Sequence, residues 1–446
     1  MWERLKLFLT IRDSRFEDLN RDNAKTVVYR DFSAGLVTAM TAIPMAMGFA
    51  MAMGLRPEQG IIAGAMACLV GRTWGGSKYQ VYGPTAAFIP LIYALMQKYD
   101  HGFLVLVSLL AGVVLCLFGL LGLGKIARYV PNSIVVGFTV GIGITIAATN
   151  LYDVLGLRAG GGPNLITKLS GVFANAGDAN WYALALGLLT FGLTRYLLRL
   201  SIYIPAPLIA VGVATVLAAT VWSTKGLTLI STRYGQIPTD FFRFTPPQLP
   251  TMTPEVWMDL AYFVVAVVFI SGVESLLCSS MADRLAGNRK TPFNPDKEFW
   301  GQGMVQIVTP LINGFPCTGA LARTATSIRA GAVTPLAGYF KFALKLAMAV
   351  FLAHYLEMVP MACIGGIMLW VASNMINVKE VRHVLAGSRF HALLMAYTAV
   401  MVPITDFLTG VLSALVIYGV LHRFFEPAGE PQLEPASTVP SKALPA

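Results

Sequence analysis

Runs of about twenty apolar residues, separated by short loops, restrict the fold of this chain more than any other feature. A helix needs about 20 apolar residues to cross the hydrocarbon core of a bilayer. Ten segments fit that length: 33–53, 102–123, 130–149, 180–199, 205–221, 255–281, 334–355, 359–377, 388–404 and 406–424. Four more are shorter or interrupted by glycine and proline: 60–72, 84–97, 298–313 and 317–331. The pattern predicts an all-α polytopic membrane protein with fourteen transmembrane segments.

Composition agrees with this prediction and excludes several other classes. Of the residues, 56% are hydrophobic and only 13% are charged, whereas about a quarter of the residues of a soluble domain are charged. The net charge of +10 comes from basic residues spread through short loops, which favours a role in membrane topology over nucleic-acid binding. No metal spacing and no supported catalytic motif occurs, so we expect neither a metal, a cofactor nor an enzyme.

The loops also predict how the chain is organised. Lysine and arginine are concentrated in alternate loops. This bias predicts a protein of the inner (plasma) membrane with both termini in the cytoplasm. Seven segments precede residue 230 and seven follow residue 255. Because each half has an odd number of segments, the second half is inverted in the membrane relative to the first. The predicted parts are a cytoplasmic N-terminal segment (1–30), two inverted repeats (31–228 and 253–425) and a flexible, proline-rich tail (426–446).

Two interrupted stretches occupy corresponding positions in the two halves. The third segment of the first half opens with VYGPTAAFIP (81–90), and that of the second half opens with FPCTGALART (315–324). Paired Gly/Pro interruptions of this kind are the best sequence pointer to a transporter's binding site. Extended backbone at membrane depth is tolerated where it lines a cavity, and a half-helix that starts there directs its N–H groups inward. The pair predicts an anion site, although kinks in tightly packed helices are the alternative.

Two charged residues within apolar segments are candidates for chemistry. The planar guanidinium of Arg323 suits oxyanions because it can bond two oxygens at once, and Glu274, in an apolar wall, has the character of a proton carrier. The alternative for both is a permanent ion pair between them. Thr85 is a further candidate for the site, Asp406 is expected to cap a helix, and Lys341 and Lys345 are given no role.

The chain resembles the SulP anion-transporter family, which includes bacterial sulfate, bicarbonate and dicarboxylate transporters and the motor protein prestin. The resemblance runs from about residue 30 to residue 425. Its matching stretches are AGLVTAMTAIPMAMGFAMAMGL, YGPTAAF, YVPNSIVVGFTVGIGI, GVESLLCSSMADRLAGNRKTPFNPDKEFWGQG and GFPCTGALARTATSIRAGAVTPLAG. It implies a 7+7 inverted repeat of the UraA-like fold, with segments 1–4 and 8–11 as the core and segments 5–7 and 12–14 as the gate. Segments 3 and 10 would be half-helices preceded by short extended strands.

The same resemblance implies a site and a mechanism. The anion would lie between the two half-helices and move by an elevator-like slide of core against gate, in a protein that is commonly a homodimer surrounded by membrane lipids. The implied lining residues are Met45, Phe49, Pro84, Thr85, Ala320, Ala322 and Arg323.

Three departures from the family pattern adjust this expectation. Met45 stands where many members have glutamine. Glu274 and Cys278 replace the aspartate and threonine of sodium-coupled members, which disfavours sodium and favours proton symport through Glu274. The tail occupies the place where most members continue into a STAS domain, so we expect a membrane domain without one.

The nature of the anion and of its coupling stays open. Sulfate, bicarbonate, oxalate, chloride and dicarboxylates all suit a site built from two helix ends and one arginine. An uncoupled conductance or a voltage-responsive, prestin-like protein is the alternative function. A nucleobase–proton symporter of the same fold is disfavoured by Arg323.

Overall fold

A computed structural model describes residues 2–124, 131–157, 165–238, 240–251, 253–405 and 407–425. A helix lies in each of the fourteen predicted segments: α2 (Ala24–Ala52), α3 (Pro57–Trp74), α4 (Ile89–Lys98), α5 (His101–Leu121), α6 (Asn132–Leu155), α8 (Trp181–Leu200), α9 (Ala206–Thr220), α11 (Pro254–Ala286), α12 (Pro295–Leu311), α13 (Leu321–Arg329), α14 (Leu336–Glu357), α15 (Met361–Met375), α17 (Arg389–Ile404) and α18 (Phe407–Phe425). Asp406 and the predicted tail at 426–446 lie outside the described residues.

Shorter elements connect these helices. They are α1 (Trp2–Leu9), α7 (Leu165–Ala174), α10 (Ile230–Tyr234), α16 (Val378–Ala386), the 3₁₀ turns η1 (Ser14–Phe16), η2 (Ala86–Phe88) and η4 (Ala176–Asp178), and the strands β1 (Tyr82–Gly83) and β2 (Thr318–Gly319). The hydropathy pattern did not predict these connecting helices because they are too short or too polar to register as crossings.

Seven of the described helices are long and apolar enough, by length and composition, to cross a membrane. They are α2, α5, α6, α8, α11, α14 and the span that begins with α15. Large apolar side chains are exposed on them, including Leu117 of α5 (49%) and Phe351 of α14 (79%). Outward-facing apolar surface on this scale suits hydrocarbon rather than water. The structure is therefore that of a helical membrane protein, while the 7+7 inverted repeat stays a prediction.

Local sequence signals set the limits of the longest helix, α11. The hydroxyl of Thr253 accepts a hydrogen bond from the N–H of Val256 (3.4 Å), and Pro254 occupies the first turn, where its missing N–H costs nothing. Gly287 ends the helix in a left-handed conformation (φ 62°), which glycine adopts without a steric penalty. These signals hold the helix that carries Glu274 in one register along its 33 residues.

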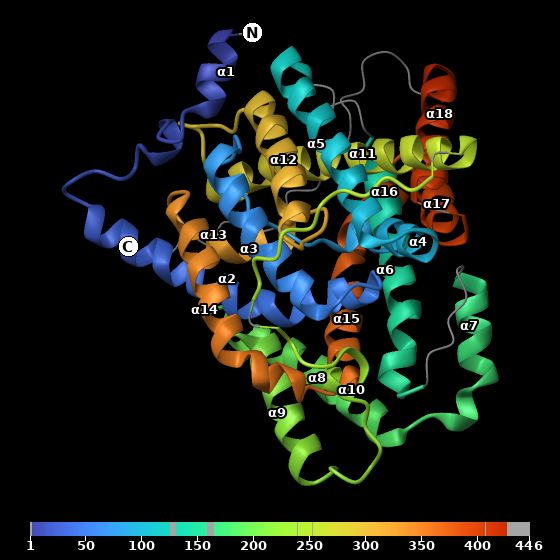
Figure 1. The fold of residues 1–446 in the computed structure, drawn as a ribbon. Coiled ribbons are helices and arrows are strands. Elements are labelled where there is room, and N and C mark those ends of the chain that lie inside the picture. The colour runs from blue at the N-terminus through green and yellow to red at the C-terminus, as the bar shows by residue number, and fades with distance from the viewer. Residues whose placement is uncertain are drawn as a thin grey trace.

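The helices pack in two groups. In one group α2 and α3 pack against α14, α12 packs against α3 and α5, and α11 contacts α5, α12 and α13; in the other, α6 packs against α15 and α17, and α8 packs against α9 and α15. Helix α2 contacts α9 and α15 and so joins the groups. Figure 1 shows α5, α11 and α12 towards one end of the molecule and α8, α9 and α10 at the other.

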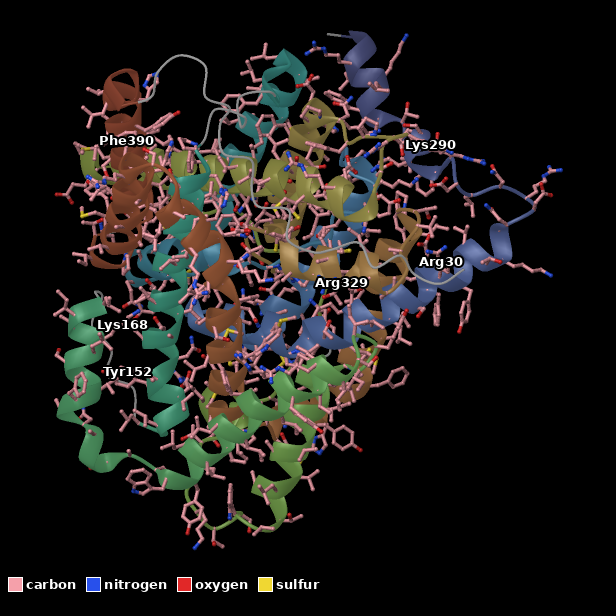
Figure 2. All side chains as sticks on the ribbon, turned by 180° about the vertical axis from the view of Figure 1, so that it is seen from behind. Arg30, Tyr152, Lys168, Lys290, Arg329 and Phe390 are labelled. Atoms are coloured by element: carbon pink, nitrogen blue, oxygen red, sulfur yellow. The ribbon has the colours of Figure 1, made fainter. Side chains whose placement is uncertain are left out.

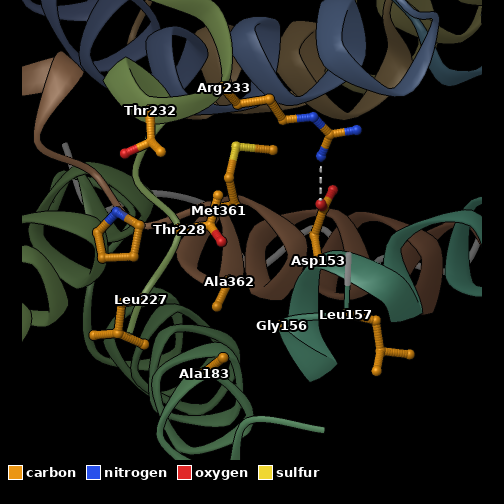
Figure 3. A pocket seen from close by; sticks show the side chains of 11 residues that line it. Asp153, Gly156, Leu157, Ala183, Leu227, Thr228, Thr232, Arg233, Met361 and Ala362 are labelled. Carbon is orange, nitrogen blue, oxygen red and sulfur yellow. Dashed lines mark hydrogen bonds and ion pairs between the residues drawn. The ribbon is translucent and has the colours of Figure 1, made fainter. Parts of the chain in front are cut away.

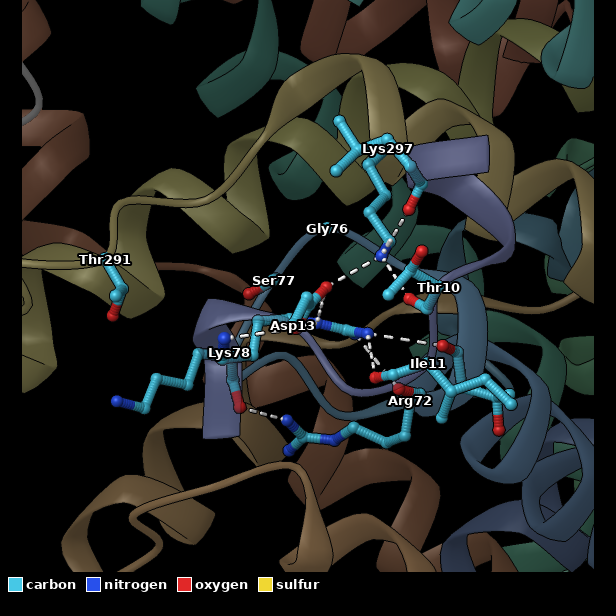
Figure 4. A network of polar contacts seen from close by, with 12 residues as sticks. Thr10, Ile11, Asp13, Arg72, Gly76, Ser77, Lys78, Thr291 and Lys297 are labelled. Atoms are coloured by element: carbon cyan, nitrogen blue, oxygen red, sulfur yellow. Dashed lines mark hydrogen bonds and ion pairs between the residues drawn. The ribbon is translucent and has the colours of Figure 1, made fainter. Parts of the chain in front are cut away.

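The N-terminal segment is held against the ends of α3 and α12 by a buried polar network (Figure 4). The Asp13 carboxylate accepts hydrogen bonds from Arg15 Nε (2.8 Å) and Lys297 Nζ (2.7 Å). Arg15 also donates to the carbonyl of Arg72 near the end of α3 (3.0 Å), and Lys297 donates to the carbonyl of Thr10 (2.8 Å). Helix α2 begins at Ala24, inside the segment predicted to precede the membrane, because its first turns extend beyond the apolar run.

The two interrupted stretches meet inside the first group of helices. Strands β1 and β2 pair antiparallel, with Tyr82 opposite Gly319 and Gly83 opposite Thr318. The N–H of Ala320 extends the pairing by donating to the carbonyl of Val81 (3.0 Å). All four strand residues are buried, and their pairing satisfies backbone groups that could find no partner in lipid. Sequences more than two hundred residues apart thus form one structural unit.

Candidate anion site

Short helices begin directly after the two strands. Thr85 precedes η2 and α4, and Ala320 precedes α13; neither residue caps the following helix with a side-chain hydrogen bond. The first N–H groups of a helix have no partner within the helix, and its dipole places about half a positive charge there. The pairing of β1 with β2 therefore brings two helix starts to the same place, which is a suitable environment for an anion.

Arg323 lies in the first turn of α13 and is 5% exposed. Its Nη2 donates to the carbonyl oxygen of Pro84, while Nη1 is buried and has no hydrogen-bond partner among the described residues. A Cβ atom at Gly83 would lie 2.8 Å from Nη1, so any larger residue would require the guanidinium to move. A buried N–H without a partner costs about 1–3 kcal/mol, and an anion would remove that cost.

Glu274 comes to the same place from α11. Its Oε2 accepts a hydrogen bond from the Thr85 hydroxyl (3.1 Å). No ion pair within 4.0 Å joins Glu274 to Arg323, both of which belong to the described part of the chain. The permanent Glu274–Arg323 pair, which the sequence left open, is therefore absent from this structure. The carboxylate and the guanidinium each contact residues 84–85 instead.

The remaining predicted site residues differ in how deeply they are buried. Met45 (8% exposed) and Phe49 (5%) of α2 belong to the same buried apolar cluster as Ala86, Ala87 and Phe88 of η2. Ala320 is half-buried at the start of α13, and Ala322 is exposed. The structure thus joins Arg323 to Pro84 and Glu274 to Thr85 by hydrogen bonds, while Met45 and Phe49 lie in the large apolar cluster that also includes η2. Their role in binding stays a prediction.

A buried carboxylate that the sequence reasoning missed holds β1 in place. Glu298 of α12 accepts hydrogen bonds from the Tyr82 hydroxyl (2.7 Å), Gln80 Nε2 (2.7 Å) and the Ser275 hydroxyl (2.6 Å). The N–H groups of Gly76 and Ser77 donate to its other oxygen (2.9 and 3.1 Å). With five donors, this carboxylate is fully satisfied and serves to fix the backbone of the site.

The next polar residues along α12 fix β2. Gln302 and Gln306 both donate to the carbonyl of Cys317 (2.6 and 3.0 Å), and Gln306 accepts from the Cys317 N–H (3.3 Å). Glu298, Gln302 and Gln306 are four residues apart and therefore share one helix face. That spacing, in a segment otherwise suited to lipid, is the signal that could have revealed this supporting layer.

Two further features lie apart from the predicted site. Arg329, the last residue of α13, is exposed, and nearby Arg30 donates to the carbonyl of Gly331 (3.2 Å; Figure 2). A cavity of about 260 Å³ lies beside the ion pair of Arg233 with Asp153 (2.8 Å; Figure 3). None of the predicted site residues lines this cavity.

The fold and these residues define a polytopic helical membrane protein in which two short helices meet at a buried, basic site. Solved structures share this fold. The transmembrane domain of a cyanobacterial bicarbonate transporter, BicA, has a TM-score of 0.74 at 22% identity, covering 90% of this chain and 98% of that one. The murine Slc26a9 anion transporter in the inward-facing state has a TM-score of 0.81 at 16% identity, covering 95% and 72%.

Sequence comparison identifies the family. Residues 28–398 match the sulfate permease family, and the chain belongs to that family. YvdB of Bacillus subtilis, whose name assigns it to sulfate transport, is 34% identical over 389 residues, 87% of this chain and 72% of that protein. The bicarbonate transporter BicA of Picosynechococcus is 27% identical over 409 residues, 88% and 69%. The family consists of transporters, which confirms the predicted resemblance and the prediction that the chain is not an enzyme.

Proposed function

We propose that this protein is a secondary active transporter of small anions of the sulfate, bicarbonate or dicarboxylate class. The observation that carries the proposal is the buried Nη1 of Arg323, which has no hydrogen-bond partner among the described residues and lies beside two uncapped helix starts. An oxyanion would accept from this N–H and from the helix N–H groups together. The sulfate and bicarbonate transport named for the relatives supports the same substrate class.

Proton coupling through Glu274 is the second part of the proposal. The carboxylate is reached by the Thr85 hydroxyl but by no cation within 4.0 Å in the described structure. A carboxyl group at this position can take up and release a proton, and its neutral form can still hydrogen-bond to the Thr85 hydroxyl. Cys278, one turn further along α11, gives a thiol where a sodium site needs oxygen.

Transport would follow the elevator-type alternating access that the family resemblance implies. The packing of the helices into two groups, joined by α2, supports a movement of one group against the other. In this proposal segments 1–4 and 8–11 form the moving core and segments 5–7 and 12–14 form the gate. A homodimer in the plasma membrane, with both termini in the cytoplasm, would keep the gates fixed while the cores move.

Counterflow in proteoliposomes tests the proposal. Vesicles loaded with unlabelled sulfate, bicarbonate, oxalate or fumarate are assayed for accumulation of the labelled anion at pH 5.5 and 7.5. Saturable counterflow of at least one anion, faster with acid outside, is expected. A steady anion current in planar bilayers without saturable counterflow would instead establish an uncoupled conductance.

A further inference from the structure

Two lysines of α14 are buried at the candidate site. Lys341 and Lys345 are 1% and 0% exposed and lie one helical turn apart, so they share a face. Helix α14 packs against α2 and α3, which bury this face. Lysine is almost never fully buried without a partner, so two in succession within one apolar helix require an explanation.

Their amines lie beside the backbone that forms the site. Lys341 Nζ lies 3.5 Å from the carbonyl oxygen of Tyr82 in β1. Lys345 Nζ lies 3.4 Å from the carbonyl oxygen of Gly60 on α3. A Cβ atom at Gly64 would collide with Lys345 Nζ and would lie 3.0 Å from Pro84 Cδ, so this amine and Pro84 are neighbours. Residues 82–84 are thus approached by Lys341, Lys345 and Arg323.

The charges around these residues do not balance within the protein. Neither lysine has an ion-pair partner in the described part of the chain, and Arg323 has none there either. Glu274 is the carboxylate that reaches the site, through Thr85. The oxygens of Glu298 are occupied by hydrogen bonds from five other groups. In the protonated state of both amines, three cationic side chains and one carboxylate give an excess of two positive charges, and an anion in the site favours that state.

We propose that Lys341 and Lys345 set the valence selectivity of the site and favour divalent over monovalent anions. The inference rests on the proposed function of residues 84–85 and 320–323 as the anion site. The attraction between fixed and mobile charges is proportional to the product of the charges. Two fixed charges near the site therefore stabilise a doubly charged anion about twice as much as a singly charged one. The lysines act through this field and through the carbonyl of Tyr82, without touching the anion.

The test compares a divalent and a monovalent probe. Half-saturating concentrations of sulfate and of bicarbonate are measured in proteoliposomes for the wild type, Lys341→Met, Lys345→Met and the double variant. Methionine keeps the length of the side chain and removes its charge. We expect the preference for sulfate over bicarbonate to fall at least threefold in each single variant and at least tenfold in the double variant. Lys379→Met, which removes an exposed lysine of α16, should leave the preference unchanged.

The outcomes separate the two proposals. An unchanged preference for sulfate over bicarbonate in both single variants, or an equal loss of affinity for both anions, would overturn the role of the lysines. Neutral or purely structural amines would not change the preference between anions of different charge. The single variants decide the matter if the double variant does not fold. A wild type that neither transports sulfate, bicarbonate, oxalate or fumarate nor gains thermal stability from any of them would refute the proposed function, and this inference with it.

Discussion

The guanidinium of Arg323 donates a hydrogen bond to the carbonyl oxygen of Pro84, which lies 239 positions earlier in the chain. This bond connects the first turn of α13 to the extended residues between β1 and η2. It uses one nitrogen of the guanidinium and leaves Nη1 without a protein partner in the described structure. Arg323 therefore holds the backbone at Pro84 with one nitrogen and leaves the other available for the anion proposed above.

Replacement of Arg323 should weaken anion binding strongly. Arg323→Ala removes a charged donor, and hydrogen bonds to charged groups contribute about 1.5–3 kcal/mol, so affinity should fall roughly ten- to a hundredfold. Titration calorimetry with the anion identified by counterflow measures this directly. Arg323→Lys keeps the charge without the fork and should recover part of the affinity. Wild-type affinity in Arg323→Ala would show that Arg323 does not form the site.

A methyl group at Gly83 should displace the guanidinium. The added Cβ would lie 2.8 Å from Arg323 Nη1, so the arginine must move. We expect at least tenfold slower uptake by Gly83→Ala, with the protein still folded. Gly235→Ala is the matched control, because this glycine also has a positive φ (75°) and nothing lies within 4 Å of its Cβ position. Equal uptake by the two variants would mean that the position of Arg323 is unimportant.

Neutralising Glu274 should separate transport from proton coupling. Glu274→Gln keeps a group that can accept from the Thr85 hydroxyl but cannot carry a proton. We expect uptake at neutral pH to persist within a few-fold of the wild type, while its acceleration by external acid disappears. Uptake is measured from pH 5 to 8 with and without a pH gradient. A wild-type pH profile in this variant would show that the proton moves elsewhere.

The contacts of Asp13 should depend on pH in a direction that the structure determines. Burial alone would raise the pKa of this carboxyl, but its hydrogen bonds and charge interactions with Arg15 and Lys297 outweigh burial and lower the pKa. A lowered pKa contributes stability that is fully present above the unfolded value, about 3.9, and is lost as the pH falls through the folded value. The N-terminal segment should stay attached at pH 5–7 and detach in stronger acid.

Asp13→Asn should reproduce this detachment at neutral pH. Removing one partner of a buried ion pair costs roughly 3 kcal/mol, because the cations of Arg15 and Lys297 remain. Hydrogen–deuterium exchange of residues 10–20 measures the loss of protection, with Asp22→Asn, an exposed neighbour, as the control. Unchanged protection in Asp13→Asn would show that backbone contacts hold the segment without these ion pairs.

The helical segments and the two interruptions could be predicted from the sequence because they depend on local pattern. Apolar runs marked the segments in which helices α2–α6, α8, α9, α11–α15, α17 and α18 lie, and the glycines and prolines of 81–90 and 315–324 marked the two interruptions where β1 and β2 form. Hydropathy is a property of a single segment, so it does not reveal which helix faces which. For that reason the inward direction of Lys341 and Lys345 was missed.

Contacts between distant segments were the least predictable part of the site. Glu298 supports Tyr82 across 216 positions of sequence, and nothing in either segment alone indicates the other. The sequence predicts only a cytoplasmic N-terminal segment and no partner for it within the protein, whereas the network of Asp13 and Arg15 holds it against α3 and α12. Its alternating charges give the same sequence pattern whether the side chains contact water or pair with each other.

The pairing of Tyr82 with Gly319 also has a consequence for biosynthesis. Strand β1 is made when less than a quarter of the chain exists, and its partner arrives after more than two hundred further residues. Contacts between such distant residues form late because a long loop must close first. During that interval the backbone of Tyr82 and Gly83 lacks the partner that the folded protein provides. A ribosome that has delivered only the first half to the membrane has therefore built one wall of the candidate site, and the other wall can form only after α13 has been inserted.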